Sequence, residues 1–241
     1  MSDKIITLLE KLRLKGMLSV LDKTLSIADS KGHPPLWVVK TLLTAEYHHQ
    51  QERSMANRLT QAKLPWDWTL ATFPFDRQPA INKQNIQALA SLEFMKRQQN
   101  IVLIGSPGTG KTGIAISLLR EAIVNGCRGR FYNAQDLIDE LYASLADSTT
   151  TKLLNKLARY DLLVIDELSY LSLKLEQSNA FFKLLDLRYG RKSTIITSNL
   201  DYEDWYQLFQ RKELVDAMLD RLQHHCITIR INGDTLRTPD S

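Results

Sequence analysis

The chain has 241 residues, of which 44% are hydrophobic and 24% are charged, with a formal net charge of +4. This composition argues against a disordered chain and allows one α/β domain plus a small additional module. Without a run of about 18 apolar residues, and with charges throughout its first residues, the chain is expected to have neither a membrane span nor a signal peptide. Two distant cysteines, Cys127 and Cys226, suit the reducing cytoplasm, and the mild basic excess permits an anionic partner such as nucleic acid.

Residues 1–75 have the pattern of a small helical domain. Apolar residues recur at helical spacing through most of the first 28 residues. Pro35 suits the first turn of a further helix, which we expect over 36–62. The prolines in and after 72–76 disfavour helix, so this segment is predicted to be an extended linker.

Residues 76–241 alternate between short apolar segments and helical patterns. The segments expected to form strands are 100–104, 129–133, 162–166, 193–197 and 226–231. The expected helices are 86–97, 111–125, 135–146, 151–159, 176–189 and 212–223. Strands interleaved with helices predict a parallel sheet that is covered on both faces. The expected fold class is therefore α/β, with a five-stranded parallel sheet preceded by a small all-helical N-terminal domain.

The sequence GSPGTGKT at 105–112 matches the phosphate-loop pattern GxxxxGK[ST]. A phosphate chain requires many inward-pointing backbone N–H groups, which a glycine-rich turn at a helix N-terminus supplies. Lys111 is expected to reach the β- and γ-phosphates, and the Thr112 hydroxyl to ligate Mg²⁺. The pattern follows an apolar strand and precedes an amphipathic helix, which favours nucleotide binding over a glycine-rich turn without a ligand. We therefore expect ATP and Mg²⁺ as cofactors. The expected nucleotide-binding residues are Gly105, Ser106, Pro107, Gly108, Thr109, Gly110, Lys111, Thr112 and Gly113.

Asp166 and Glu167 place two carboxylates at the end of an apolar strand. Asp166 is expected to hold the Mg²⁺ shell through water, and Glu167 to polarise a water for attack on the γ-phosphorus. A strand that merely ends in polar residues is the alternative interpretation. The position of these carboxylates, about 55 residues after a phosphate loop, favours the catalytic interpretation. The adjacency of Asp166 and Glu167 favours ATP hydrolysis over nucleotide storage.

Asn199 and Arg221 are the remaining candidate catalytic residues. If segment 193–197 lies between the first and third strands, Asn199 faces the γ-phosphate and orients the lytic water. A loop or helix-cap role for Asn199 is the alternative. Arg221 lies on an amphipathic helix, from which it can enter a neighbouring subunit's site and stabilise the transferring phosphoryl group. The alternative is a surface arginine paired with Asp216 or Asp220.

Basic residues flank the acidic strand in the sequence. Lys152, Lys156 and Arg159 precede it and Lys174 follows it. Cations there would neutralise the phosphates of a DNA backbone without reading bases. An ordinary solvated helix face is an equally open interpretation, and no helix-turn-helix pattern indicates base-specific contacts. We therefore expect weakly sequence-selective, salt-sensitive binding to a nucleic-acid backbone.

Several stretches go beyond the general ATPase motifs: LRLKGM at 12–17, AKLP at 62–65, NIVLIG at 100–105, LARYDLL at 157–163, ITSN at 196–199 and LDRL at 219–222. Over nearly the whole chain they resemble the IstB-like branch of the AAA+ ATPases, which is related to the DnaC helicase loaders. The resemblance implies a homo-oligomer that assembles on double-stranded DNA with ATP, deforms the DNA, and recruits or activates a cognate transposase. It also implies that Arg221 is the arginine finger and that 73–76 lies near the adenine.

Two features depart from that family pattern. Gly113 stands where many relatives have histidine, which weakens the start of the helix. Only 20 residues follow Arg221, too few for a helical lid domain, and this leaves Arg237 as the candidate substitute for a sensor arginine. The helical N-terminal domain is expected to oligomerise, bind DNA or contact the transposase. A DnaC-like helicase loader is the alternative function, and a small-molecule kinase is disfavoured by the missing lid and by Asp166 and Glu167 together with Asn199.

Overall fold

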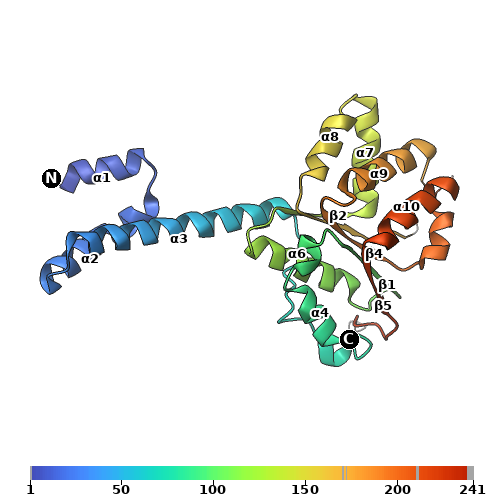
Figure 1. Cartoon of the computed structure of the whole chain (residues 1–241), viewed down its shortest axis with the longest axis horizontal. Helices are drawn as coiled ribbons and strands as arrows, with labels where there is room; N and C mark the ends of the chain where they lie inside the picture. The colour runs from blue at the N-terminus through green and yellow to red at the C-terminus, as the bar shows by residue number, and fades with distance from the viewer. Residues whose placement is uncertain (1, 170, 172, 210–211, 238–241) are drawn as a thin grey trace. The chain divides into compact units, whose positions relative to one another are not determined.

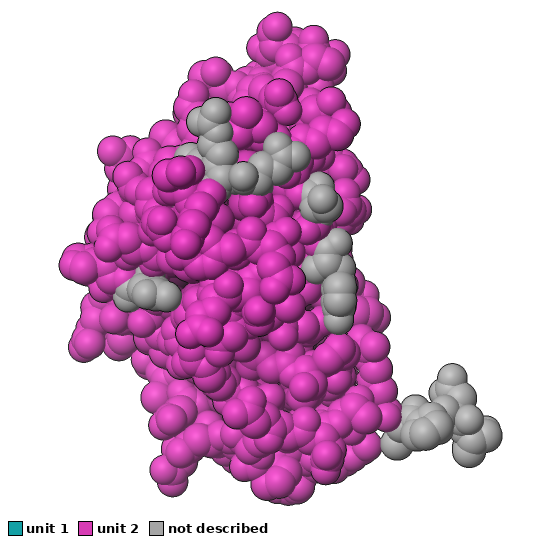
Figure 2. Space-filling view, turned by 90° about the vertical axis from the view of Figure 1, so that its right-hand side faces the viewer, with its two compact units in different colours: residues 1–58 teal, residues 59–241 magenta. Residues whose placement is uncertain are grey.

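The computed structural model describes residues 2–169, 171, 173–209 and 212–237. The chain forms two compact units, Met1–Arg58 and Leu59–Ser241, which we call unit 1 and unit 2. Unit 2 is the larger, and Figure 2 shows one of its faces in magenta. Residues 59–75 thus belong to the compact unit that carries the phosphate loop. The expected functional boundary at residue 75 stays a prediction.

Unit 1 is helical, as expected. Its helices are α1 (Ser2–Lys11), α2 (Lys15–Lys31) and α3 (Pro35–Ala62), the last of which continues into unit 2. Gly16 allows α2 to cross α3 closely, because a Cβ there would lie 2.6 Å from the Ala45 carbonyl oxygen. The buried Glu46 carboxylate accepts the N–H groups of Gly16 and Met17 at 2.7 and 3.1 Å. The first turn of α2 is therefore capped by a side chain of α3.

Unit 2 contains a five-stranded parallel sheet. Its strands are β1 (Asn100–Gly105), β2 (Gly129–Asn133), β3 (Leu162–Asp166), β4 (Ser193–Ser198) and β5 (Cys226–Ile231), in the order β2-β3-β4-β1-β5. All four neighbouring pairs are parallel, so the carboxyl ends of the strands meet at one edge. The predicted fold class is confirmed, and β4 lies between β1 and β3 as the proposed role of Asn199 requires.

Helices cover both faces of this sheet (Figure 1). They are α4 (Lys83–Leu89), α5 (Glu93–Lys96), α6 (Lys111–Val124), α7 (Ala134–Ala146), α8 (Thr150–Ala158), α9 (Leu175–Arg188) and α10 (Lys212–His224), with 3₁₀ helices η1 (Phe75–Arg77) and η2 (Tyr202–Gln207). Val102 and Ile104 of β1 pack with α7 to α10, whereas Ile101 and Leu103 pack with α4, α5 and α6. Alternate residues therefore enter two separate cores, which explains why β1 is apolar from Ile101 to Ile104.

Two local predictions were wrong. The predicted helix over 86–97 is divided into α4 and α5, because Leu92 adopts the left-handed conformation with φ 59° and interrupts the helix. The predicted extended linker over 72–76 instead leads into η1, which buries Phe75. From the end of β5 to Arg237 the described chain contains no helix. None of the helices in the described ranges has the length and apolar character needed to cross a membrane.

A buried arginine fixes α8 against the rest of unit 2. Arg188, at the end of α9, is only 1% exposed. Its guanidinium donates to the carbonyl oxygens of Leu157 and Tyr160 and to the Thr194 hydroxyl, each at 2.9 Å, and also to the Ser193 carbonyl. Burial lowers the pKa of Arg188 to about 9. The arginine adds hydrogen bonds to carbonyl groups at and just past the end of α8, of which that of Leu157 also accepts the Tyr160 N–H at 3.4 Å.

Candidate functional site

A cleft of about 1280 Å³ lies at the carboxyl edge of the sheet. The predicted catalytic residues that line it are Lys111, Asp166, Glu167 and Asn199, together with the predicted metal ligand Thr112. Phe73 and Pro74 of the predicted adenine segment line it as well, as does Arg237. Arg221 and the four candidate DNA-binding residues are not part of its lining. The fold therefore gathers most of the predicted site from five separate stretches of sequence.

The phosphate loop joins β1 to α6 and depends on glycine at several points. Gly108 and Gly110 have φ values of 81° and 96°, in the left-handed region that favours glycine. Gly105 lies against β5, since a Cβ there would be 2.3 Å from the Ile231 carbonyl oxygen. A Cβ on Gly113 would lie 3.3 Å from the Phe73 ring. Glycine at position 113 therefore makes room for this aromatic residue, in addition to its effect on helix propensity.

Lys111 is nearly buried beneath the loop that it is expected to serve. Its Nζ donates to the carbonyl oxygens of Gly105 at 2.6 Å and Ser106 at 2.7 Å. Burial lowers the pKa of Lys111 to about 8, against the opposing attraction of Asp166 and Glu167. The ammonium group is therefore held in the loop, near the position that a phosphate chain would occupy.

We expect ATP binding to weaken by about tenfold between pH 7.5 and pH 9. Below pH 8 Lys111 already carries its proton, whereas above pH 8 the free protein loses that proton and ATP binding must take one up. Calorimetric titration in two buffers of different ionisation enthalpy measures both the affinity and the proton uptake. Lys111→Arg is the control, because arginine stays charged and removes the pH dependence. Equal affinity at both pH values without proton uptake contradicts the prediction.

Asp166 lies among hydroxyl groups at the end of β3. It accepts hydrogen bonds from the Thr197 hydroxyl at 2.6 Å and from the Thr112 hydroxyl at 2.9 Å. Burial raises the pKa of Asp166, and these two hydrogen bonds oppose that rise. Carboxylate and hydroxyl oxygens are the hard ligands that Mg²⁺ prefers, so the contact between Thr112 and Asp166 fits such an ion.

Glu167 is held in an unusual backbone conformation. Its φ is 61°, the left-handed region that a residue with a side chain rarely adopts. Its N–H donates to the Thr197 hydroxyl at 2.9 Å, and its carboxylate accepts the side-chain amide of Asn133 at 3.3 Å. Asn133 was not among the residues predicted from the sequence. The available signal was a polar residue at the end of β2, which pairs in register with Asp166.

Asn199 follows β4 and is half-buried at the cleft. Its N–H donates to the hydroxyl of Ser169 at 2.8 Å. Ser169 itself follows the acidic pair of β3, and its hydroxyl lies 3.3 Å from that of Ser198. The two segments that carry Glu167 and Asn199 are therefore joined through buried serines, of which Ser169 was also missed.

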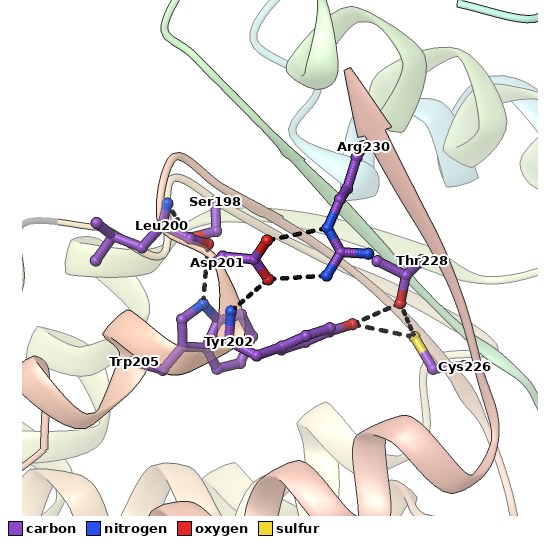
Figure 3. Close-up of polar contacts among 8 residues, drawn as sticks. All are labelled: Ser198, Leu200, Asp201, Tyr202, Trp205, Cys226, Thr228 and Arg230. Atoms are coloured by element: carbon purple, nitrogen blue, oxygen red, sulfur yellow. Dashed lines mark hydrogen bonds and ion pairs between the residues drawn. The ribbon is translucent and has the colours of Figure 1, made fainter. Parts of the chain in front are cut away.

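The segment after Asn199 is fastened to β5 by a polar network (Figure 3). Asp201 accepts two hydrogen bonds from the Arg230 guanidinium, both at 2.9 Å. The Tyr202 hydroxyl lies 2.7 Å from that of Thr228, and the Trp205 indole donates to the Leu200 carbonyl at 3.2 Å. This network fastens the segment that follows Asn199 to the edge strand β5.

Arg221 lies away from the cleft of its own chain. Its Nε is 3.1 Å from Asp186 of α9, and its guanidinium lies 5.1 Å from the centre of the Phe182 ring. Asn100 and Thr194, at the amino ends of β1 and β4, line the same small cavity as Arg221. At about 3.3 Å per residue, a strand of this length separates that edge from the cleft by roughly 17 Å. The alternative interpretation, a surface arginine paired within its own chain, named Asp216 or Asp220, whereas the ion pair is with Asp186.

The candidate DNA-binding residues fall into two groups. Lys152, Lys156 and Arg159 are exposed at spacings of four and three residues, which places them on one face of α8 and its end. We call these three residues the basic stripe. Lys174 is exposed at the start of α9 and lies 5.5 Å from the centre of the Tyr142 ring. The structure therefore brings together three of the four residues.

This strand order, with a phosphate loop after β1, an acidic pair after β3 and a polar end on β4, defines a P-loop protein of the AAA+ class. A family model described as "IstB-like ATP binding protein" matches residues 7–241. The chain belongs to the IstB-like ATP-binding protein family, which confirms the resemblance found in the sequence.

Curated relatives share most of the chain. An ATP-binding protein of insertion sequence IS21 from Pseudomonas aeruginosa is 38% identical over 81% of this chain and 74% of its own length. An ATP-binding protein of insertion sequence IS232 from Bacillus thuringiensis subsp. berliner is 32% identical over 98% of this chain and 95% of its own.

Solved structures show the same fold. The replication initiator DnaA bound to AMPPCP and single-stranded DNA matches with a TM-score of 0.60 at 23% identity, over 71% of this chain and 52% of DnaA, about half its length. The DnaC helicase loader matches with a TM-score of 0.54 at 25% identity, over 70% of this chain and 99% of that structure.

Proposed function

We propose that this chain is an ATP-hydrolysing, DNA-binding regulator of transposition, acting in the cytoplasm. It oligomerises on double-stranded DNA in the presence of ATP, deforms the DNA, and recruits or activates a partner transposase. The observation that carries the ATPase part is the hydrogen bond of the phosphate-loop residue Thr112 to Asp166, directly beside Glu167. The relatives encoded in insertion sequences support the transposition part.

Nucleotide binding rests on the phosphate loop. Its backbone N–H groups and the N-terminus of α6 donate hydrogen bonds to the phosphate chain, and Lys111 leaves the carbonyl oxygens of Gly105 and Ser106 to meet the β- and γ-phosphates. Thr112 and Asp166 would hold Mg²⁺, Asp166 through water. The ion would supply charge neutralisation between the β- and γ-phosphates.

Hydrolysis requires a water placed for attack on the γ-phosphorus. Glu167 accepts the proton of that water, and Asn199 orients it from the neighbouring strand. Before it accepts that proton, the carboxylate of Glu167 leaves the side-chain amide of Asn133. The serines that join the two segments keep Glu167 and Asn199 at a fixed separation.

Arg221 acts on the site of a neighbouring subunit. Its position near the amino edge of the sheet, with Asn100 and Thr194, supports action in trans over action in its own cleft. A guanidinium supplied by the neighbour makes hydrolysis depend on assembly. The ion pair with Asp186 keeps the side chain oriented until that neighbour is present.

The basic stripe contacts the phosphate backbone of DNA, with Lys174 as an additional candidate. Three exposed cations on one helical face provide charge without a means of reading bases. The helical unit 1 supplies contacts to other subunits, to DNA or to the transposase.

The test is duplex DNA binding with a slowly hydrolysed ATP analogue across a salt series. Replacing the basic stripe by Lys152→Gln, Lys156→Gln and Arg159→Gln is expected to weaken binding and to reduce the salt slope by about one for each phosphate that is no longer neutralised. The matched control replaces the exposed Lys83, Lys96 and Arg97 by glutamine. If the stripe variant keeps the wild-type salt dependence of its DNA affinity, the basic stripe is not the DNA-binding surface. If the DNA affinity of the wild type does not depend on salt concentration, the protein does not recognise the phosphate backbone.

A DnaC-like loader of a replicative helicase is the second candidate, favoured by the fold match to the DnaC helicase loader. Both functions use the same ATPase core and differ in partner. Pull-down of a purified replicative helicase against a purified transposase of the same insertion sequence separates them. Capture of the helicase alone contradicts the transposition proposal.

A further inference from the structure

A buried glutamine joins the linker, the phosphate loop and the C-terminal segment. Gln78 directly follows η1 and is 1% exposed. Its Nε2 donates to the carbonyl oxygen of Asp234 at 2.7 Å and to that of Thr109 at 3.4 Å. Because both partners are carbonyl oxygens, the NH₂ end of the amide must face them. The side chain therefore has a defined orientation between two segments that are distant in sequence.

Residues 233–237, which we call the strap, lie directly on the phosphate loop. The N–H of Leu236 donates to the Gly108 carbonyl oxygen at 2.8 Å. A Cβ on Gly108 would lie 2.0 Å from the Thr235 hydroxyl, and a Cβ on Gly233 would lie 1.8 Å from the Gln78 side-chain oxygen. Glycine at both positions is therefore what permits this close approach of the strap, the loop and Gln78.

These hydrogen bonds determine how two peptide groups of the loop are turned. In a trans peptide the carbonyl of one residue and the N–H of the next point in opposite directions. Donors outside the loop engage the carbonyls of Gly108 and Thr109, namely Leu236 and Gln78. The N–H groups of Thr109 and Gly110 consequently point away from these donors, which leaves them available to a phosphate group bound in the loop.

We propose that Gln78, with the strap, is a positioning residue for nucleotide binding that turns these peptide groups toward the phosphates before the nucleotide arrives. The inference rests on the proposed binding of ATP at this loop. Gln78 does not line the cleft, so it acts through the loop and not by touching the nucleotide. A loop that has to be ordered by its ligand binds that ligand more weakly. Because the oriented N–H groups serve the phosphates that ATP and ADP share, both nucleotides lose affinity equally.

The test is Gln78→Met, which keeps the size of the side chain and removes its donor. Gln87→Met on the exposed face of α4 is the matched control. Fluorescence titration with labelled ATP and ADP is expected to show affinities lower by about tenfold for both nucleotides in Gln78→Met, the effect of removing about one hydrogen bond. The control keeps wild-type affinities. At saturating ATP the turnover of Gln78→Met stays within about twofold of the wild type, which separates a binding effect from a general loss of structure.

A second variant keeps the test decisive if methionine at position 78 prevents folding. Gly233→Ala lies outside the phosphate loop and forces Gln78 away from the strap. It is expected to lower the affinities for ATP and ADP to a similar degree. Wild-type affinity in folded Gln78→Met, or in Gly233→Ala, overturns the positioning role alone while wild-type protein still binds ATP. A wild-type protein that binds no ATP overturns the proposed function, and this inference with it.

Discussion

Replacing Arg221 with alanine is expected to lower ATP hydrolysis by the DNA-bound assembly by about 10³-fold, while an isolated subunit binds ATP as before. The reason is the placement of Arg221, outside its own cleft and beside residues at the amino edge of the sheet. An arginine supplied to a neighbouring site typically contributes at least this factor to phosphoryl transfer. Steady-state hydrolysis with duplex DNA, together with nucleotide titration without DNA, measures both quantities. Arg191→Ala, an exposed arginine just past α9, is the matched control.

Mixed assemblies test whether Arg221 acts on a neighbour. Subunits with Arg221→Ala retain an intact Glu167, and subunits with Glu167→Gln retain an intact Arg221. Mixing these two inactive proteins creates interfaces with both intact groups, so part of the activity is expected to return. Action in trans is contradicted if Arg221→Ala alone hydrolyses ATP at the normal rate. It is also contradicted if the mixed subunits assemble but recover no ATP hydrolysis.

Replacing Glu167 with glutamine is expected to reduce turnover by about 10²- to 10⁴-fold and to leave ATP bound. The amide keeps the size of the side chain but cannot accept the proton of the attacking water. Single-turnover measurement with radiolabelled ATP separates the chemical step from product release. The same variant is expected to remain assembled on DNA, because the bound ATP is no longer hydrolysed to ADP.

The control for this variant is Glu176→Gln, an exposed carboxylate in the first turn of α9. It does not line the cleft, so its turnover stays at the wild-type level. If Glu167→Gln turns over ATP at nearly the rate of the control, another group accepts the proton, and the proposed role of Glu167 is contradicted.

Much of the fold was predictable because its signals are local. The strands Gly129–Asn133, Leu162–Asp166 and Cys226–Ile231 have the predicted limits, since short strand-forming segments between helical patterns are typical of a parallel sheet. The division between α4 and α5 was not predictable, because helical spacing continues across Leu92 and the left-handed turn there depends on its packing. Helix η2 was missed for a similar reason, since Trp205 anchors it through burial.

The site was predictable where a spacing has one chemical explanation. The phosphate loop and Asp166 belong to that group, and the hydrogen bond between Asp166 and Thr112 agrees with it. Asn133, Ser169 and Gln78 were missed because each is a common polar residue whose partner lies 30 or more residues away. Which distant groups meet is decided by the packing of the sheet, and a single sequence carries no local signal for it.

The left-handed backbone at Glu167 has a consequence for protein engineering. Glycine adopts such a φ without the cost of about 1–3 kcal/mol that other residues bear. A search for thermally stable variants would therefore favour glycine at position 167, because it relieves the backbone there. The same replacement would remove the carboxylate proposed to activate water. Selection for stability and selection for turnover thus oppose each other at a single residue, and only a screen that includes ATP hydrolysis would keep the glutamate.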